Sequence, residues 1–154
     1  MPGFKKLARL IVIGLAVVVG LVSYNLTVPA GRSSASNWGF AFSHPTILLH
    51  IIAATVVLAL AGFMLLRAIL ARSARWTVLS AAGLAFLALA YLAGAQYVAV
   101  LHKGALSLMG NAWLAAIVTY GIGWWLGRRE ERAITRAAGP DTRPAAATQT
   151  GVRK

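Results

Sequence analysis

Apolar residues fill most of this chain in four long runs, and short polar segments separate the runs. They lack the period-two alternation of half-buried β-strands, and stretches such as Val56–Ala61 are continuously apolar. A helix needs about 20 residues to cross the hydrocarbon core of a bilayer, and each run supplies that many. We therefore expect an all-α fold, an integral membrane four-helix bundle with spans over about 7–28, 45–70, 76–101 and 105–126.

The distribution of Lys and Arg predicts how this bundle is oriented. All but two of the 15 cationic residues lie at the start of the first span, at the junction of the second and third, or after the fourth, whereas Arg32 and Lys103 lie on the opposite side. Cytoplasmic loops carry an excess of Lys and Arg, so both termini are expected in the cytoplasm of a bacterium, with the protein in its cytoplasmic membrane. The cytoplasmic cations are Lys5, Lys6, Arg9, Arg67, Arg72, Arg75, Arg128, Arg129, Arg132, Arg136, Arg143, Arg153 and Lys154.

The chain divides into one membrane domain and a tail. Residues 1–138 form the four-transmembrane-helix domain. Residues 139–154, rich in Ala, Thr, Pro, Gly and Arg, cannot bury a core and predict a disordered basic cytoplasmic tail. The segment from Pro29 to Ser43 is expected to be an outer loop whose aromatic end lies at the interface or folds over the bundle.

The first apolar run has a second interpretation, as a cleaved signal peptide. Lys5 and Lys6 precede it, and Val28-Pro-Ala30 has the small-residue spacing of a cleavage site. The run is long for the apolar core of a signal, which favours an uncleaved membrane helix.

The amino-acid composition is also typical of a membrane protein. Of the 154 residues, 59% are hydrophobic and 12% are charged, about half the charged share of a soluble domain. The net charge of +12 follows from the membrane topology, because the basic residues flank apolar runs, and it gives no reason to expect a nucleic-acid partner. With no cysteine, disulfides and thiolate metal sites are excluded.

Acidic residues are absent from the four spans. Glu130, Glu131 and Asp141 all follow the last span. The bundle therefore has no carboxylate to relay protons or coordinate a hard cation within the membrane. This argues against an ion pump, a carboxylate-lined transporter and an intramembrane aspartyl hydrolase.

The three histidines lie on the outer side of the bundle, and His50 and His102 differ in depth by about 9 Å. Two histidines on neighbouring helices are what a bis-histidine haem requires. We expect His50 and His102 to ligate the iron of haem b, with His44 as an alternate ligand or gate. Small residues beside them would let a flat macrocycle approach, and nearby cations would meet its propionates. The small residues are Ala54 and Ala99, with Tyr91 further along the face that carries His102, and the cations are Lys103 and Arg32.

Other interpretations of these polar residues stay open. The same histidines suit a non-haem transition-metal site, or they are interface residues with no cofactor. Gln96 and Asn111 can bind a quinone head group or bond across helices, and Met109 is an alternative axial ligand or a packing residue.

Three segments resemble the small four-helix b-type cytochromes of bacterial membranes. They are Leu49–Ala54, the basic stretch Arg67–Arg75, and Val100–His102, so the resemblance covers spans two and three only. It implies an oxidoreductase, or the anchor subunit of one, that exchanges electrons with quinol, a soluble redox partner protein or superoxide at the outer face. That group commonly has a second set of histidines on the cytoplasmic side, and this chain has none, so no second haem is implied.

Two functions of different classes follow. The first is a membrane-bound b-type haem protein that carries electrons near the outer face. The second is a cofactor-free accessory or assembly subunit that packs against partner helices in a homo- or hetero-oligomer. The fourth span offers it a packing face at Gly110, Gly121, Gly123 and Gly127.

Overall fold

The computed structural model describes residues 2–22 and 33–137, and these ranges contain five helices and no strand. This confirms the predicted all-α class. Part of the first predicted span (residues 23–28), Arg32 and the predicted tail at 139–154 lie outside the described residues. The helices are α1 (Pro2–Val22), α2 (Ser34–Ser43), α3 (Pro45–Leu70), α4 (Ala74–Val100) and α5 (Lys103–Ala137).

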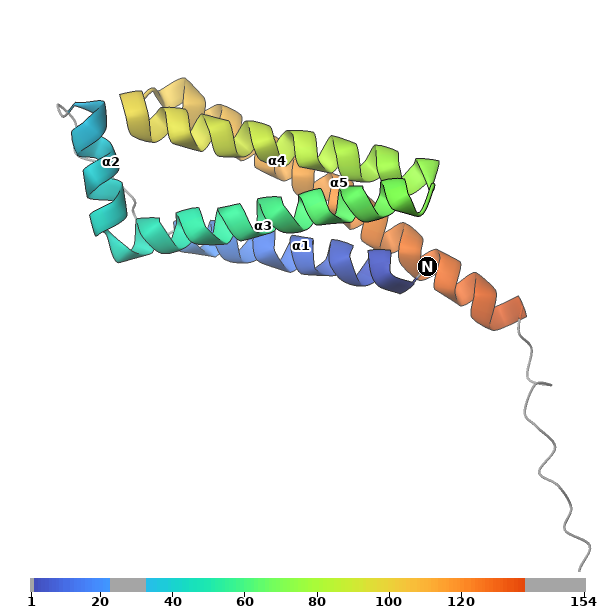
Figure 1. The fold of residues 1–154 in the computed structure, drawn as a ribbon. Coiled ribbons are helices and arrows are strands. Elements are labelled where there is room, and N and C mark those ends of the chain that lie inside the picture. The colour runs from blue at the N-terminus through green and yellow to red at the C-terminus, as the bar shows by residue number, and fades with distance from the viewer. Residues whose placement is uncertain (1, 23–32, 138–154) are drawn as a thin grey trace, which may run out of the picture.

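The four long helices pack side by side, and each contacts two others (Figure 1). Helix α1 packs on α3 and α5, and α4 packs on the same two helices. Helix α3 covers the second predicted span, while α5 continues well beyond the fourth. We name the two ends of this arrangement by their residues: the histidine end (His44, His50, His102) and the arginine end (Arg67, Arg72, Arg75, Arg128).

The segment expected to be an outer loop contains helix α2, which lies across the histidine ends of α3 and α4 (Figure 1). Ser33 caps it, because its Oγ accepts a hydrogen bond from the backbone N–H of Ser36 at 3.3 Å. Asn37 and Ala41 are buried on one face of α2. Tertiary packing thus stabilises a short helix that its Ser- and Gly-containing sequence does not predict.

The α3–α4 and α4–α5 connections are short, which makes the helices that they join antiparallel. Between α3 and α4, Arg72 adopts a left-handed conformation (φ 50°), and the Ser73 N–H donates to the Ala68 carbonyl at 3.2 Å. Between α4 and α5, Leu101 is also left-handed (φ 53°). These turns place Arg67, Arg72 and Arg75 at one end of the bundle and His102 at the other.

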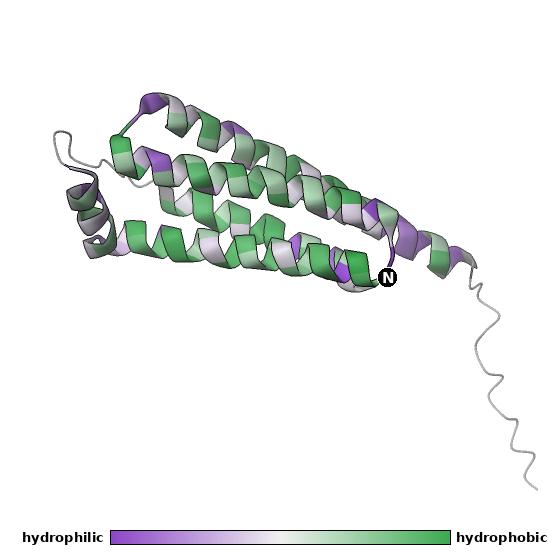
Figure 2. Ribbon diagram, turned by 45° about the horizontal axis from the view of Figure 1, so that its top comes forward, coloured by the Kyte–Doolittle hydropathy of each residue, from purple (hydrophilic) through white to green (hydrophobic). Residues whose placement is uncertain are grey.

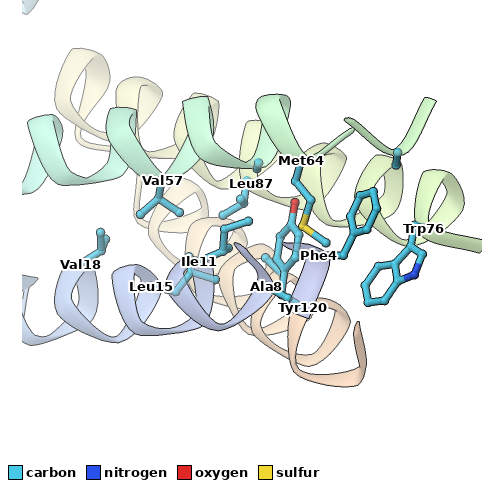
Figure 3. Packing of buried hydrophobic residues seen from close by; sticks show 13 residues of the cluster. Phe4, Ala8, Ile11, Leu15, Val18, Val57, Met64, Trp76, Leu87 and Tyr120 are labelled. Atoms are coloured by element: carbon cyan, nitrogen blue, oxygen red, sulfur yellow. The ribbon is translucent and has the colours of Figure 1, made fainter. Parts of the chain in front are cut away.

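A buried core runs between the four long helices with spacings of three and four residues (Figure 3). This spacing puts one apolar stripe of each helix against its neighbours, as in coiled-coil packing. In α3 the alanines Ala61 and Ala68 alternate with the larger Val57 and Met64, and α1 contributes Ala8 to the same core. The core residues are Phe4, Ala8, Ile11, Leu15, Val18, Val57, Ala61, Met64, Ala68, Trp76, Leu87, Ala116 and Tyr120.

The faces that point away from this core are also apolar (Figure 2). Large hydrophobic side chains lie exposed along every long helix; Leu70, for example, is 73% exposed and Val78 68%. Helices α3, α4 and α5 are long and apolar enough to cross a membrane. Apolar exteriors of this kind are compatible with contact to a lipid bilayer and indicate a membrane protein.

Candidate functional site

His50 lies in the second turn of α3 and is directed toward α1. Its Nδ1 is 3.1 Å from the carbonyl oxygen of Val18, and the residue is half-buried. A carbonyl oxygen can only accept a hydrogen bond, so Nδ1 is the donor, and the neutral imidazole keeps its lone pair on Nε2. Ligating histidines are oriented in this way, by a backbone carbonyl that accepts from the nitrogen not bound to the metal.

A second side chain reaches the same part of α1. The indole Nε1 of Trp113, on α5, donates to the carbonyl oxygen of Leu15 at 3.3 Å. Leu15 and Val18 lie one turn apart on the buried face of α1. Donors from α3 and α5 therefore converge on α1 near the histidine end. The sequence analysis did not single out Trp113 for this role, because the bond depends on how α5 is rotated against α1.

His102 lies in the α4–α5 connection and is exposed. Its ring folds beside the start of α5: a β-carbon added at Gly104 would stand 2.7 Å from His102 Cε1 and 3.0 Å from Nδ1. The absence of a side chain at Gly104 thus allows the ring to occupy this position. Within the described residues, the His102 side chain makes no hydrogen bond.

His44 joins α2 to α3. It is the C-cap of α2 and the N-cap of α3, and its side chain caps neither helix. Its exposed ring stacks on Phe40, with ring centroids 4.3 Å apart. The three histidines therefore lie at one end of the molecule in three different settings: against α1, beside Gly104 and on α2.

The residues expected to flank a macrocycle lie on α3 and α4. Ala54 is half-buried against the core, and Ala99 is half-buried on α4. Tyr91 is 38% exposed, and its hydroxyl lies 3.4 Å from Thr55 Oγ1, which links α4 to α3. Thr55 carries no signal in the sequence, since its pairing with Tyr91 depends on the register of the two helices.

The remaining predicted polar residues are mostly at the surface. Lys103 is exposed at the first position of α5. Gln96 and Asn111 are exposed, and their amides make no hydrogen bond to another described residue. Met109 packs on α4, because a β-carbon added at Gly94 would meet its sulfur at 3.1 Å.

Among the residues that the structure describes, three buried polar atoms lack a hydrogen-bond partner, and the sequence analysis did not identify them. They are Asn37 Oδ1 on α2, Ser80 Oγ on α4 and the Tyr120 hydroxyl on α5. Tyr120 points from α5 into the core near Met64 and Leu87 (Figure 3). In the sequence it lies in an apolar run, where nothing marks it as central.

The part of the chain that the structure describes holds no group of three or more His, Asp or Glu residues able to bind a metal ion. A haem iron needs only two histidines, so a two-ligand site is a separate question.

No family model, no curated protein and no solved structure matches the chain.

Proposed function

We propose that this chain is a four-helix transmembrane bundle of the bacterial cytoplasmic membrane that holds haem b and carries electrons near the outer face. The observation that carries the proposal is the bond from His50 Nδ1 to the Val18 carbonyl. It fixes the orientation of the ring and leaves Nε2 free to ligate a metal.

The orientation of the bundle is argued from charge. The arginine end carries Lys5, Arg9 and the arginines of the α3–α4 connection, whereas Lys103 is the one described cation of the histidine end. The positive-inside rule then puts the arginine end, and both termini, in the cytoplasm. The described part of α1 would be the start of the first predicted span, which together with α3, α4 and α5 would make four.

The fit of the residues to haem is good at His50 and partial elsewhere. His102 is exposed at the end of the neighbouring helix α4, with no hydrogen bond to another described residue that would have to break. Ala54 and Ala99 add little bulk, and Tyr91 is already bonded to Thr55. Lys103 follows His102 directly and suits a propionate. Bound haem would supply one-electron redox chemistry, and these residues would hold and orient it.

The reaction class follows from that chemistry. A single haem at the outer face suits an oxidoreductase, or its anchor subunit, that exchanges electrons with quinol, superoxide or a redox partner protein. The exposed amides of Gln96 and Asn111 are the donors available to a quinone head group on this side.

A cofactor-free subunit that packs on partner helices is the second candidate. The observation in its favour is the open space at Gly110 and Gly121, where an added β-carbon would meet nothing within 4 Å. Gly123 and Gly127, in contrast, already pack on Trp76 and Lys5 within the chain. Two of these four glycines, Gly110 and Gly121, thus remain for contact with another protein.

Visible spectroscopy of the protein purified in detergent separates the two candidates. We expect a Soret band that shifts on reduction with dithionite and a sharp α-band. His50→Ala and His102→Ala should each abolish or alter these bands, and His44→Ala should leave them intact. A colourless preparation that takes up no added haem overturns the haem proposal, and an unchanged spectrum in either variant removes that histidine as a ligand.

A further inference from the structure

A hollow of about 300 Å³ lies between α1 and α5 at the arginine end, lined by Lys5, Arg9, Trp124 and Arg128. Lys5 and Arg9 are four residues apart on α1, and Trp124 and Arg128 are four residues apart on α5. Each pair therefore lies on one face of its helix, and the two faces meet at the hollow. Gly127 lets the helices approach, because a β-carbon there would be 3.1 Å from Lys5 Cβ.

The charges around the hollow do not cancel. Lys5 is paired with Glu131, and Glu130 is paired with Arg75 at 2.8 Å. Those two glutamates are the only carboxylates in the described residues. Arg9 and Arg128 consequently have no described acidic partner, and they leave the hollow with an excess of two positive charges.

Trp124 gives the hollow an apolar wall. The guanidinium of Arg128 lies over the Trp124 ring, with its Cζ 5.6 Å from the centroid. Trp residues favour the headgroup level, where one part of the ring meets hydrocarbon and its N–H meets polar groups. A ligand here would meet arginine donors on its polar part and an indole beside its apolar part.

We propose that this hollow binds the phosphodiester headgroup of an anionic phospholipid from the adjacent leaflet. Arginine donors match phosphate oxygens, and basic pockets between helices on the cytoplasmic side suit such headgroups. The acyl chains would lie along the exposed apolar faces of α1 and α5. The site is independent of the proposed haem, so its failure and that of the haem are separate outcomes.

Native mass spectrometry of the full chain in detergent tests the proposal, with phosphatidylglycerol as the probe and phosphatidylcholine as the neutral comparison. We expect phosphatidylglycerol to bind more tightly, and Arg9→Gln/Arg128→Gln to weaken it roughly thirtyfold. Lys6→Gln/Arg136→Gln is the matched control, since it also removes one exposed cation from α1 and one from α5. Equal weakening by the two double variants would show general charge attraction and overturn the site.

Soluble phosphate is the other source of the same chemistry, and a competition arm separates it from lipid. Inorganic phosphate or glycerol 3-phosphate, at concentrations matched to the lipid, should leave bound phosphatidylglycerol in place. Displacement at matched concentration would assign the hollow to a free phosphate and overturn the lipid assignment.

A measurement on the folded protein in vesicles removes any dependence on how the arginine variants fold. Phosphatidylglycerol with brominated acyl chains should quench tryptophan fluorescence more than brominated phosphatidylcholine at the same mole fraction. The excess should disappear in Trp124→Phe and persist in Trp125→Phe, the adjacent exposed tryptophan. Equal quenching by both lipids in the unmodified protein contradicts the proposal.

Discussion

The phenol ring of Tyr120 occupies the space that a side chain at Gly83 would fill. A β-carbon added at Gly83 would lie 2.5 Å from Tyr120 Cζ and 2.9 Å from its hydroxyl oxygen. The contact joins α5 to α4 in the middle of the core, where Tyr120 is 1% exposed. The absence of a side chain at Gly83 therefore permits the close approach of these two helices.

Gly83→Ala should destabilise the protein, because a rigid aromatic ring must move to admit the new methyl group. We expect a loss of about 1–3 kcal/mol, the usual cost of overpacking, seen as a lower apparent unfolding temperature in detergent. Gly62→Ala on α3 is the control, since its β-carbon would meet nothing within 4 Å. It should be neutral or stabilise by up to about 1 kcal/mol. Equal effects of both changes would contradict the packing argument.

Tyr120→Phe should stabilise the protein. The Tyr120 hydroxyl is buried and has no hydrogen-bond partner among the described residues, so its removal eliminates an unsatisfied polar group and keeps the ring. The expected gain is about 1 kcal/mol in unfolding free energy, measured by chemical or thermal denaturation. Tyr91→Phe, which breaks the contact with Thr55, should give no such gain. A clear loss of stability in Tyr120→Phe would mean that the hydroxyl binds a water or ligand.

His50→Leu should weaken the packing of α3 on α1, because the Val18 carbonyl loses its donor from His50. In haem-free protein we expect a loss of about 0.5–1.5 kcal/mol, the net value of one hydrogen bond. His44→Leu changes an exposed histidine at the same end and should have little effect. If both variants unfold at the temperature of the unmodified protein, the His50 bond contributes nothing to stability.

The ion pair between Arg75 and Glu130 should contribute little to stability. Its side chains are 48% and 36% exposed, and exposed pairs are worth about 0.2–1 kcal/mol. A double-mutant cycle with Arg75→Gln and Glu130→Gln, measured at low and high salt, should give a coupling energy in this range that falls as salt screens it. A coupling that salt does not reduce would indicate a pair shielded from water.

Cysteine labelling tests the orientation of the bundle, and the chain suits it because it has no native cysteine. Ser36→Cys on α2 should react with an impermeant maleimide added to cells whose cytoplasmic membrane is intact. Thr135→Cys on α5 should react only after that membrane is permeabilised. Both positions are exposed, so access depends on the side of the membrane. The opposite pattern would invert the proposed topology.

Apolar run length and charge position were enough to predict the helical class and the membrane character of the chain. Helix α3 has the bounds of the second predicted span because Pro45 and the turn at Arg72 limit it on both sides. Helix α2 was not predicted, since Ser34–Ser43 has no helical apolar period and is stabilised by contacts with α3 and α4.

The candidate site was harder to predict because it depends on helix rotation. The sequence marks His50 as unusual, but its bond to Val18 depends on the angle at which α3 meets α1. Asn37, Ser80 and Tyr120 gave no signal, because burial without a partner is a property of packing. The ligand roles of His50 and His102 stay predictions.

Helix α1 has α5, the last helix of the described residues, as one of its two neighbours among the long helices. Synthesis runs from the N-terminus, so the Leu15 carbonyl and the Lys5 ammonium are made long before Trp113 and Glu131, the residues that bind them. Until α5 is made, the side of α1 that will face it lacks this neighbour. The packing of the bundle is therefore completed when α5 packs on α1, and a chain that stopped before α5 would lack this contact.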